Sequence, residues 1–308
     1  MRQSRATLTP LACGSLRDAL ACSLSLVPLG RDEFAKYHAL GNDYLVVDGD
    51  ALRPKLDPER VRALCDRHTG IGSDGILALH RPRRGEILLR IWNPDGSEAE
   101  KSGNGVRIFA RFLWDFRYVR ARELEIDTAG GRVRARLELR GKEVRAIRVD
   151  MGHASFRSSD LPMLGPPRDV IDEPLRVGSV DLRVTCVSVG NPHCVRFVDV
   201  LQPEVLRSIG PQLESHPLFP KRTNVQLARV RSRGDVEILI WERGAGETRA
   251  SGSSSCAVAA AAHRLGKVDG KVTVHMPGGA LRIEIGDDYA LRMTGPATPI
   301  YRGTLLRA

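Results

Sequence analysis

The sequence predicts a mixed α/β protein made of two matching halves, with one functional site between them. Two observations carry this prediction. Short β runs bounded by turn residues alternate with two longer segments of helical periodicity, and one pattern of polar residues occurs twice along the chain. The 308 residues are enough for two domains that each bury a core of their own.

In the first half, strands are expected where short apolar runs end at turn residues such as Gly130-Gly131. A helix is expected over Val106–Phe116, because apolar residues recur there at helical spacing. The expected strands are Tyr44–Asp48, Ile87–Trp92, Leu124–Asp127, Val133–Leu139 and Val144–Met151.

The second half repeats this order. An alanine-rich helix is expected over Cys256–Leu265, again between strands. The expected strands are Leu182–Val189, Cys194–Val198, Val236–Trp241, Val272–His275 and Leu281–Ile285.

The repeated polar pattern can be counted directly. Asn42 lies 60 residues before Ser102, and Asn191 lies 60 residues before Ser251. Two shorter spacings also match, because polar residues precede each serine by nine and by four positions. Those residues are Asn93 and Glu98 in the first half, and Glu242 and Glu247 in the second. We interpret the match as an internal repeat and expect a single site in the cleft between the halves.

Each repeated serine precedes a glycine-containing segment that opens a helix. Such segments are often plain turns, but a helix start also directs free N–H groups and partial positive charge at an anion. Two such starts facing one cleft would hold the carboxylate of an amino acid from both sides. The residues in these segments are Gly103 and Asn104 after Ser102, and Gly252 and Ser253 after Ser251.

Three further positions are candidates for the site. His193 is either a structural histidine or a residue that accepts or positions a proton. Glu242 and Arg243 are either a solvated pair or, because they end a strand on the site side, functional. Asn224 is either an ordinary loop residue or a donor to a substrate carboxylate or amine.

The composition narrows the classes of partner that the protein is expected to bind. The formal net charge is +10 and aromatic residues make up 5% of the chain. A basic surface suits nucleic acid, but no basic run is interleaved with aromatic residues. We therefore expect a solvated arginine-rich surface and no nucleic-acid partner. No run approaches the roughly 20 apolar residues that span a bilayer, so no membrane partner is expected.

The six cysteines show no C-x-x-C pair and no histidine-rich partner segment, so we expect no metal site. A chain of this length does not depend on disulfides. We interpret the cysteines as free thiols and predict a cytoplasmic protein. Residues 1–33 differ in character from the rest, and we expect a disordered extension or a start codon placed too far upstream.

Several motifs together resemble the diaminopimelate epimerase family. Each motif is weak alone, but the ordered set, running from about Phe34 to the C-terminus, is specific. The motifs are Tyr37–Tyr44, His68–Gly75, Asn93–Ser97, Gly103–Gly105, Gly190–His193, Arg222–Asn224, Glu242–Thr248 and Met276–Gly279.

The resemblance implies two pseudo-symmetric halves, each a mainly antiparallel β-sheet or barrel around a central helix. They would span residues 34–150 with 297–308, and residues 151–296. It also implies a homodimer and a site that needs no pyridoxal phosphate or other cofactor. The implied reaction inverts the α-carbon of LL-diaminopimelate to the meso form, for lysine and peptidoglycan precursors. The implied substrate-binding residues are Asn42, Asn93, Asn191, Asn224, Glu242 and Arg243, with His193 as the site histidine.

Two positions depart from the family pattern. Its two catalytic cysteines align with Ser102 and Ser251, and Cys256 matches a later, non-catalytic position. A thiol titrates near 8.5 and lower at a helix N-terminus, whereas a serine hydroxyl is a far weaker acid. Epimerisation by bare serines is therefore expected to be slow unless His193 or Glu242 relays the proton. Two alternatives remain open: one-sided proton removal on another amino or hydroxy acid, and a homologue that binds an amino acid with impaired catalysis.

Overall fold

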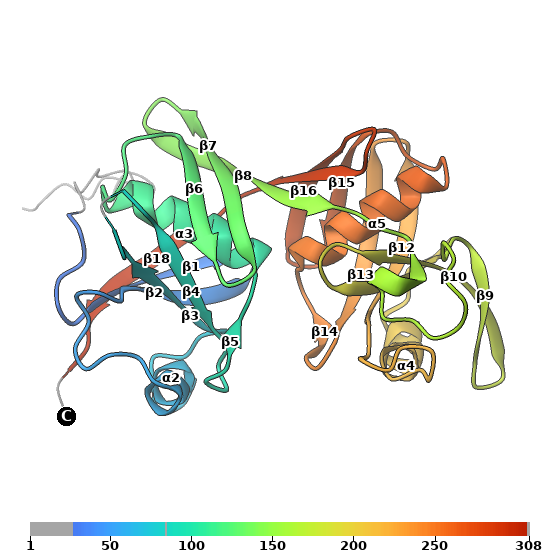
Figure 1. The fold of residues 1–308 in the computed structure, drawn as a ribbon, viewed down its shortest axis with the longest axis horizontal. Coiled ribbons are helices and arrows are strands. Elements are labelled where there is room, and N and C mark those ends of the chain that lie inside the picture. Colours follow the sequence, from blue (N-terminus) through green and yellow to red (C-terminus); the bar gives the residue numbers. More distant parts are fainter. Residues whose placement is uncertain (1–26, 84, 307–308) are drawn as a thin grey trace, which may run out of the picture.

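The computed structural model describes residues 27–83 and 85–306, which form two lobes side by side (Figure 1). One long helix lies within each lobe, α3 (Gly103–Asp115) in the first and α5 (Gly252–Arg264) in the second, with strands packed around it. The predicted mixed α/β class with two matching halves is confirmed.

Helices and strands follow one another in the same order in the two lobes. The first contains β1 (Glu33–Ala39), β2 (Asn42–Asp48), α2 (Pro58–Cys65), β3 (Ile76–His80), β4 (Leu88–Trp92), β5 (Glu98–Ala99), α3, β6 (Glu123–Thr128), β7 (Gly131–Arg140) and β8 (Glu143–His153). A 3₁₀ turn, η1 (Ser158–Asp160), and β9 (Glu173–Val177) follow. The second contains β10 (Val180–Ser188), β11 (Pro192–Phe197), α4 (Pro203–Glu214), β12 (Asn224–Ser232), β13 (Asp235–Glu242), β14 (Gly246–Thr248), α5, β15 (Lys271–Met276), β16 (Gly279–Ile285) and β17 (Ala290–Gly295), and β18 (Thr298–Thr304) ends the chain.

Strand pairing repeats between the lobes in kind and order. In the first, β1–β2 is antiparallel, β2–β3 parallel, β3–β4 and β4–β5 antiparallel, β4–β6 parallel, and β6–β7–β8 antiparallel. The series from β10 to β17 has the same orientations at every corresponding step. The repeated polar pattern in the sequence therefore reflects a repeat of the whole strand–helix order.

Three pairings join the ends of the two series. The last strands, β8 and β17, pair antiparallel with each other where the lobes meet. The strand after β8 is β9, which pairs with β10, the first strand of the second series. The strand after β17 is β18, which pairs with β1, the first strand of the first series. The C-terminal strand thus returns to the first lobe, whereas the exact domain boundaries remain a prediction.

Both central helices are apolar on most of their surface, as expected for helices enclosed by strands. In α5 every residue from Ser254 to Ala262 is buried, and the small alanine side chains let the surrounding strands approach closely. In α3, Phe109 and Phe112 fill the equivalent space and are fully buried. One hydrophobic cluster runs through both lobes around these helices, and two smaller clusters lie beneath α2 and α4.

Two sequence predictions concern the ends and the cysteines. Residues 1–26 of the predicted N-terminal extension lie outside the described residues, and Leu29 is buried with its N–H donating to Tyr118 Oη at 2.8 Å. The four cysteines within the described chain are free, and Cys13 and Cys22 lie outside it. None of the helices in the described ranges is both long and apolar enough to cross a membrane.

Candidate active site

Ser102 and Ser251 cap the two central helices in the same way. Both have extended backbone, with φ/ψ of −147°/115° at Ser102 and −145°/125° at Ser251. The Oγ of Ser102 accepts from the N–H of Gly105 at 3.0 Å, and the Oγ of Ser251 accepts from the N–H of Ser254 at 3.4 Å. This is the usual role of serine at an N-cap, where a side-chain oxygen satisfies one free N–H of the first turn.

The two helix starts converge on one side chain, that of Met293 in β17. A Cβ added to Gly103 would lie 3.0 Å from Met293 Cε, and one added to Gly252 would lie 2.9 Å from Met293 Sδ. Met293 is fully buried, so each glycine leaves room for a methionine shared by the two helices. The partial positive charges of both helix N-termini therefore act on the same region between the lobes.

A chain of amide contacts supports the first helix start. Asp74 accepts from Asn42 Nδ2 at 2.9 Å, and Asn42 Oδ1 accepts from Asn104 Nδ2 at 3.1 Å. Asn104 Oδ1 accepts in turn from Arg107 Nη2 at 2.8 Å. Arg107 is fully buried, and burial lowers its pKa to about 10. These hydrogen bonds fix which atom each amide presents to its neighbour.

A carboxylate stands beside the second helix start. Burial raises the pKa of Glu242, and a hydrogen bond from the Ser251 hydroxyl opposes that rise. The negative charge of Asp74, from the first lobe, raises it further. Ser253 Oγ lies 3.4 Å from Ser251 Oγ. A carboxylate that holds a proton more firmly than usual, next to a hydroxyl, is suited to accept that hydroxyl's proton.

Tyr44 contributes a phenol to the first helix start. Its Oη lies 3.4 Å from Ser102 Oγ, and only 7% of the residue is exposed. Burial raises the pKa of Tyr44 to about 12; the hydrogen bond with Ser102 opposes the rise, and the charges of Asp74, Glu242 and Asp43 add to it. The two serines thus have different partners, a phenol at one and a carboxylate at the other.

His193 is fully buried in the second lobe, and both of its ring nitrogens have partners. Gln226 Nε2 lies 3.1 Å from Nδ1, so Nδ1 accepts and the Nε2–H donates to Asn191 Oδ1 at 3.0 Å. Burial lowers the pKa of His193 to about 3. Gln226 also donates to Ser254 Oγ at 3.0 Å, which connects His193 to the first turn of α5.

The remaining candidates are Asn224, Arg243 and Asn93. Asn224 is buried, donates to the carbonyl of Pro192 at 2.8 Å and accepts from the N–H of Arg243 at 3.0 Å. The Arg243 side chain is exposed and donates to the carbonyl of Lys221. Asn93 donates to Ser97 Oγ at 3.0 Å within its own turn.

Comparison with known proteins identifies the chain. The family model for diaminopimelate epimerase matches residues 34–157 and 185–300. This chain belongs to the diaminopimelate epimerase family. Diaminopimelate epimerase 2 of Nostoc sp. is 49% identical over 274 residues, which cover 89% of this chain and 95% of that protein. The enzyme of Moorella thermoacetica is 42% identical over 272 residues, covering 88% and 98%.

The fold extends to more distant proteins. A hydroxyproline epimerase from Agrobacterium vitis, solved with trans-4-hydroxy-L-proline, superposes with a TM-score of 0.66 at 16% identity. The match covers 88% of this chain and 91% of that one and shows a common architecture. The resemblance to diaminopimelate epimerases that the motifs indicate is therefore confirmed, and the named relatives are isomerases.

Sequence reasoning about this diaminopimelate epimerase homologue missed four residues. Tyr44 and Asp74 lie inside the motifs that carry the resemblance, but no spacing marks their side chains as functional. Arg107 lies one helical turn after Asn104, and Gln226 lies on the strand next to that of His193. Only the fold reveals their contacts with these predicted residues. A polar residue within an otherwise apolar segment, such as Arg107 in its helix, is the one signal that could have found them.

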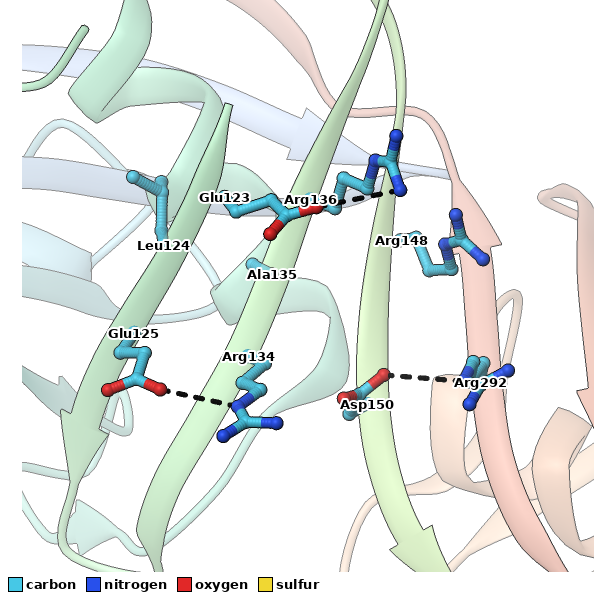
Figure 2. A pocket seen from close by; sticks show the side chains of 9 residues that line it. All are labelled: Glu123, Leu124, Glu125, Arg134, Ala135, Arg136, Arg148, Asp150 and Arg292. Atoms are coloured by element: carbon cyan, nitrogen blue, oxygen red, sulfur yellow. Dashed lines mark hydrogen bonds and ion pairs between the residues drawn. The ribbon is translucent and has the colours of Figure 1, made fainter. Parts of the chain in front are cut away.

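A surface cavity of about 370 Å³ is lined by none of the residues of the two helix starts (Figure 2). It is lined by β6, β7, β8 and β17, and arginines and carboxylates alternate across it. Arg134 lies 3.3 Å from Glu125, and Arg292 lies 3.9 Å from Asp150. Opposite charges paired across neighbouring strands are typical of a solvated sheet face, so we do not assign the epimerase site to this cavity.

Proposed function

We propose that this chain inverts the α-carbon of LL-diaminopimelate to give the meso form, as a cofactor-independent isomerase. The observation that carries the proposal is the pair of capping serines on pseudo-symmetric helices, whose adjoining glycines pack on one methionine. Such an arrangement offers one hydroxyl to each face of a substrate held between the lobes. The names of the closely similar relatives supply the substrate.

Inversion requires one proton to leave the α-carbon and another to arrive on the opposite face. In one direction, Ser251 removes the α-hydrogen while its own proton passes to Glu242, and the electron pair of the broken C–H bond delocalises toward the α-carboxylate. Ser102 then gives its proton to the other face and becomes an alkoxide. Proton return from Glu242 through solvent to the Ser102 alkoxide restores the carboxylate and the hydroxyl, and in the reverse direction the same transfers run backward.

The helix N-termini stabilise the charge that develops in this step. Free N–H groups and partial positive charge at both starts act on the carboxylate as it gains electron density. The residues we assign to these starts are Gly103, Asn104, Gly252 and Ser253. We assign Asn42, Asn93, Asn191, Asn224 and Arg243 to the other polar groups of the substrate.

Glu242 and His193 take different parts in this proposal. The raised pKa of Glu242 and its contact with Ser251 support a role in accepting the proton. His193 has both nitrogens occupied and a pKa lowered to about 3, so it holds Asn191 and Gln226 in place rather than relaying the proton. We expect His193→Ala to weaken substrate binding more than the chemical step.

Exchange in heavy water tests the function. The protein is incubated with LL-diaminopimelate in D₂O, and the α-proton is followed by NMR. Loss of that proton with appearance of the meso isomer supports the proposal. A new olefinic product would instead establish one-sided proton removal, and saturable binding without exchange would establish a binding protein.

We also propose that the enzyme is a cytoplasmic homodimer, as the family resemblance implies. Within each chain, we place the boundaries between the two domains near residues 150 and 297. The pairing of β18 with β1 supports the assignment of the C-terminal strand to the first domain. Light scattering of the purified protein tests the dimer, and a mass of one chain would contradict it.

A further inference from the structure

Two tyrosines from neighbouring strands reach opposite ends of α3. Tyr37 in β1 and Tyr44 in β2 are direct cross-strand partners, so their side chains share a face of the sheet. Tyr37 Oη donates to Asp115 at the C-terminal end of the helix at 3.0 Å. Tyr44 Oη lies 3.4 Å from Ser102 Oγ at its N-cap. The first contact is remote from the proposed site, and the second is part of it.

Either hydroxyl of the Tyr44–Ser102 pair has a hydrogen to donate. Burial and three nearby carboxylates raise the pKa of Tyr44 to about 12 against the lowering effect of its hydrogen bond with Ser102, so the phenol keeps its proton near neutral pH. A protonated phenol is able to donate to Ser102 Oγ, which also accepts from the N–H of Gly105. When Tyr44 is the donor, both contacts are directed at the oxygen, and the hydrogen of Ser102 is free to point toward a substrate.

The ring of Tyr44 is held in place by a close approach to Gly75. A Cβ at Gly75 would lie 2.8 Å from Tyr44 Cε1 and 2.4 Å from the carbonyl oxygen of Trp92. Glycine at this position, with φ of +151°, therefore leaves the room that the ring occupies. The phenol is a preorganised donor, because its ring position is set by packing before any ligand binds.

The two serines accordingly have unlike surroundings. Ser251 has a carboxylate to receive its proton, whereas Ser102 has two donors that stabilise negative charge on its oxygen. We propose that Tyr44 is a positioning residue that stabilises the Ser102 alkoxide and so lets a serine serve as the second acid–base group. When Ser102 gives its proton to the α-carbon, its O–H bond breaks and a C–H bond forms, and the Tyr44 phenol, the stronger acid of the two, shares its own proton with the Ser102 oxygen along the hydrogen bond. This assignment rests on the proposed epimerase function.

The first experiment compares Tyr44→Phe with Tyr37→Phe, which removes a matched buried hydroxyl away from the site. Tyr44→Phe is expected to lower kcat about ten- to a hundred-fold, the usual weight of a hydrogen bond to a charged group, with KM nearly unchanged. The isomer that presents its α-hydrogen to Ser251 is expected to keep exchanging in D₂O without inversion, because that side is intact. Tyr37→Phe is expected to retain the wild-type kcat. Equal kcat values for Tyr44→Phe and wild type would overturn the assignment.

A second experiment reads the hydrogen bond without any substrate. Ser102→Cys introduces a thiol at the helix start, and its pKa is measured from the pH dependence of alkylation, with the modified peptide located by mass spectrometry. Adding Tyr44→Phe is expected to raise that pKa by about one unit, because a donor to the thiolate is lost. An unchanged thiol pKa refutes the role of Tyr44 whatever the substrate. A wild-type protein that fails to exchange diaminopimelate, with the thiol pKa shifted as expected, refutes only the proposed function.

Discussion

The buried guanidinium of Arg107 donates to Asn104 Oδ1 over 2.8 Å and thereby orients the amide of Asn104 toward Asn42. Arg107→Met is expected to lower kcat/KM by about ten-fold or more, because Asn104 loses the donor that holds its amide. The melting temperature is expected to change little, since removing a desolvated charge offsets the lost hydrogen bonds. Arg111→Met, four residues along the same helix, removes a salt bridge to Asp115 and serves as the control. A control variant as inactive as Arg107→Met would contradict this explanation.

Glu242 gives the rate a pH dependence of known sign. Burial raises its pKa above the usual 4.5, so the acidic limb of the kcat profile is expected above that value and is expected to vanish in Glu242→Gln. A carboxyl group with a raised folded pKa contributes stability below its unfolded pKa and loses it as pH rises through the folded pKa. Glu242→Gln is therefore expected to be more stable than wild type at pH 7, with the difference disappearing toward pH 4. The exposed Glu247, paired with Arg207 at 2.7 Å, provides the control variant Glu247→Gln. A retained acidic limb in Glu242→Gln would exclude Glu242 as the proton acceptor.

His193 makes stability depend on pH in the opposite direction to Glu242. Its folded pKa of about 3 lies below the ordinary 6.5, so the unfolded chain binds a proton that the folded one excludes. Its contribution to stability is present above pH 6.5 and is lost as pH falls toward 3, at about 1.4 kcal/mol per unit. The difference in urea-unfolding free energy between wild type and His193→Gln across this range isolates the effect. An imidazole NMR signal that titrates near pH 6.5 would show that the ring is not held neutral.

The glycines that begin the central helices should be coupled through Met293. Gly103→Ala and Gly252→Ala each force Met293 to move, at an expected cost of about 1–3 kcal/mol in the free energy of unfolding. Because both methyl groups displace the same side chain, the double variant is expected to lose less than the sum of the two. Gly234→Ala, with open space around its Cβ position, is the control. Strict additivity in urea unfolding would mean that the helix starts do not share this contact.

Ser102→Cys with Ser251→Cys tests whether the hydroxyls limit the rate. A thiol at a helix N-terminus ionises far more readily than a hydroxyl in the same place, so kcat for epimerisation is expected to rise at least ten-fold. The single variants are expected to gain less, since both faces of the α-carbon need an acid–base group. A double variant no faster than wild type would show that another step, such as closure or product release, limits the reaction.

Local patterns in the sequence were sufficient for much of the fold. The expected strand over Val236–Trp241 is β13 (Asp235–Glu242), and the expected helix over Cys256–Leu265 is α5, which begins four residues earlier. These succeed because a short β run and a helical period depend on residues close in the chain. The elements missed were β1, β3, β9, β12, β17, β18, α2 and α4, together with the short β5 and β14. Among them β18 (Thr298–Thr304) lacks an apolar pattern of its own and is stabilised by its pairing with β1.

The same division applies to the two serines. Their equivalence was determined by the sequence alone, because an N-cap depends on a side chain and an N–H three residues later. Their difference was decided only by the tertiary structure. Tyr44 reaches Ser102 from 58 residues away, and the burial that sets the pKa values of Tyr44, Glu242 and His193 comes from strands of the whole lobe. Desolvation depends on what surrounds a group in three dimensions, and no local spacing in a sequence records it.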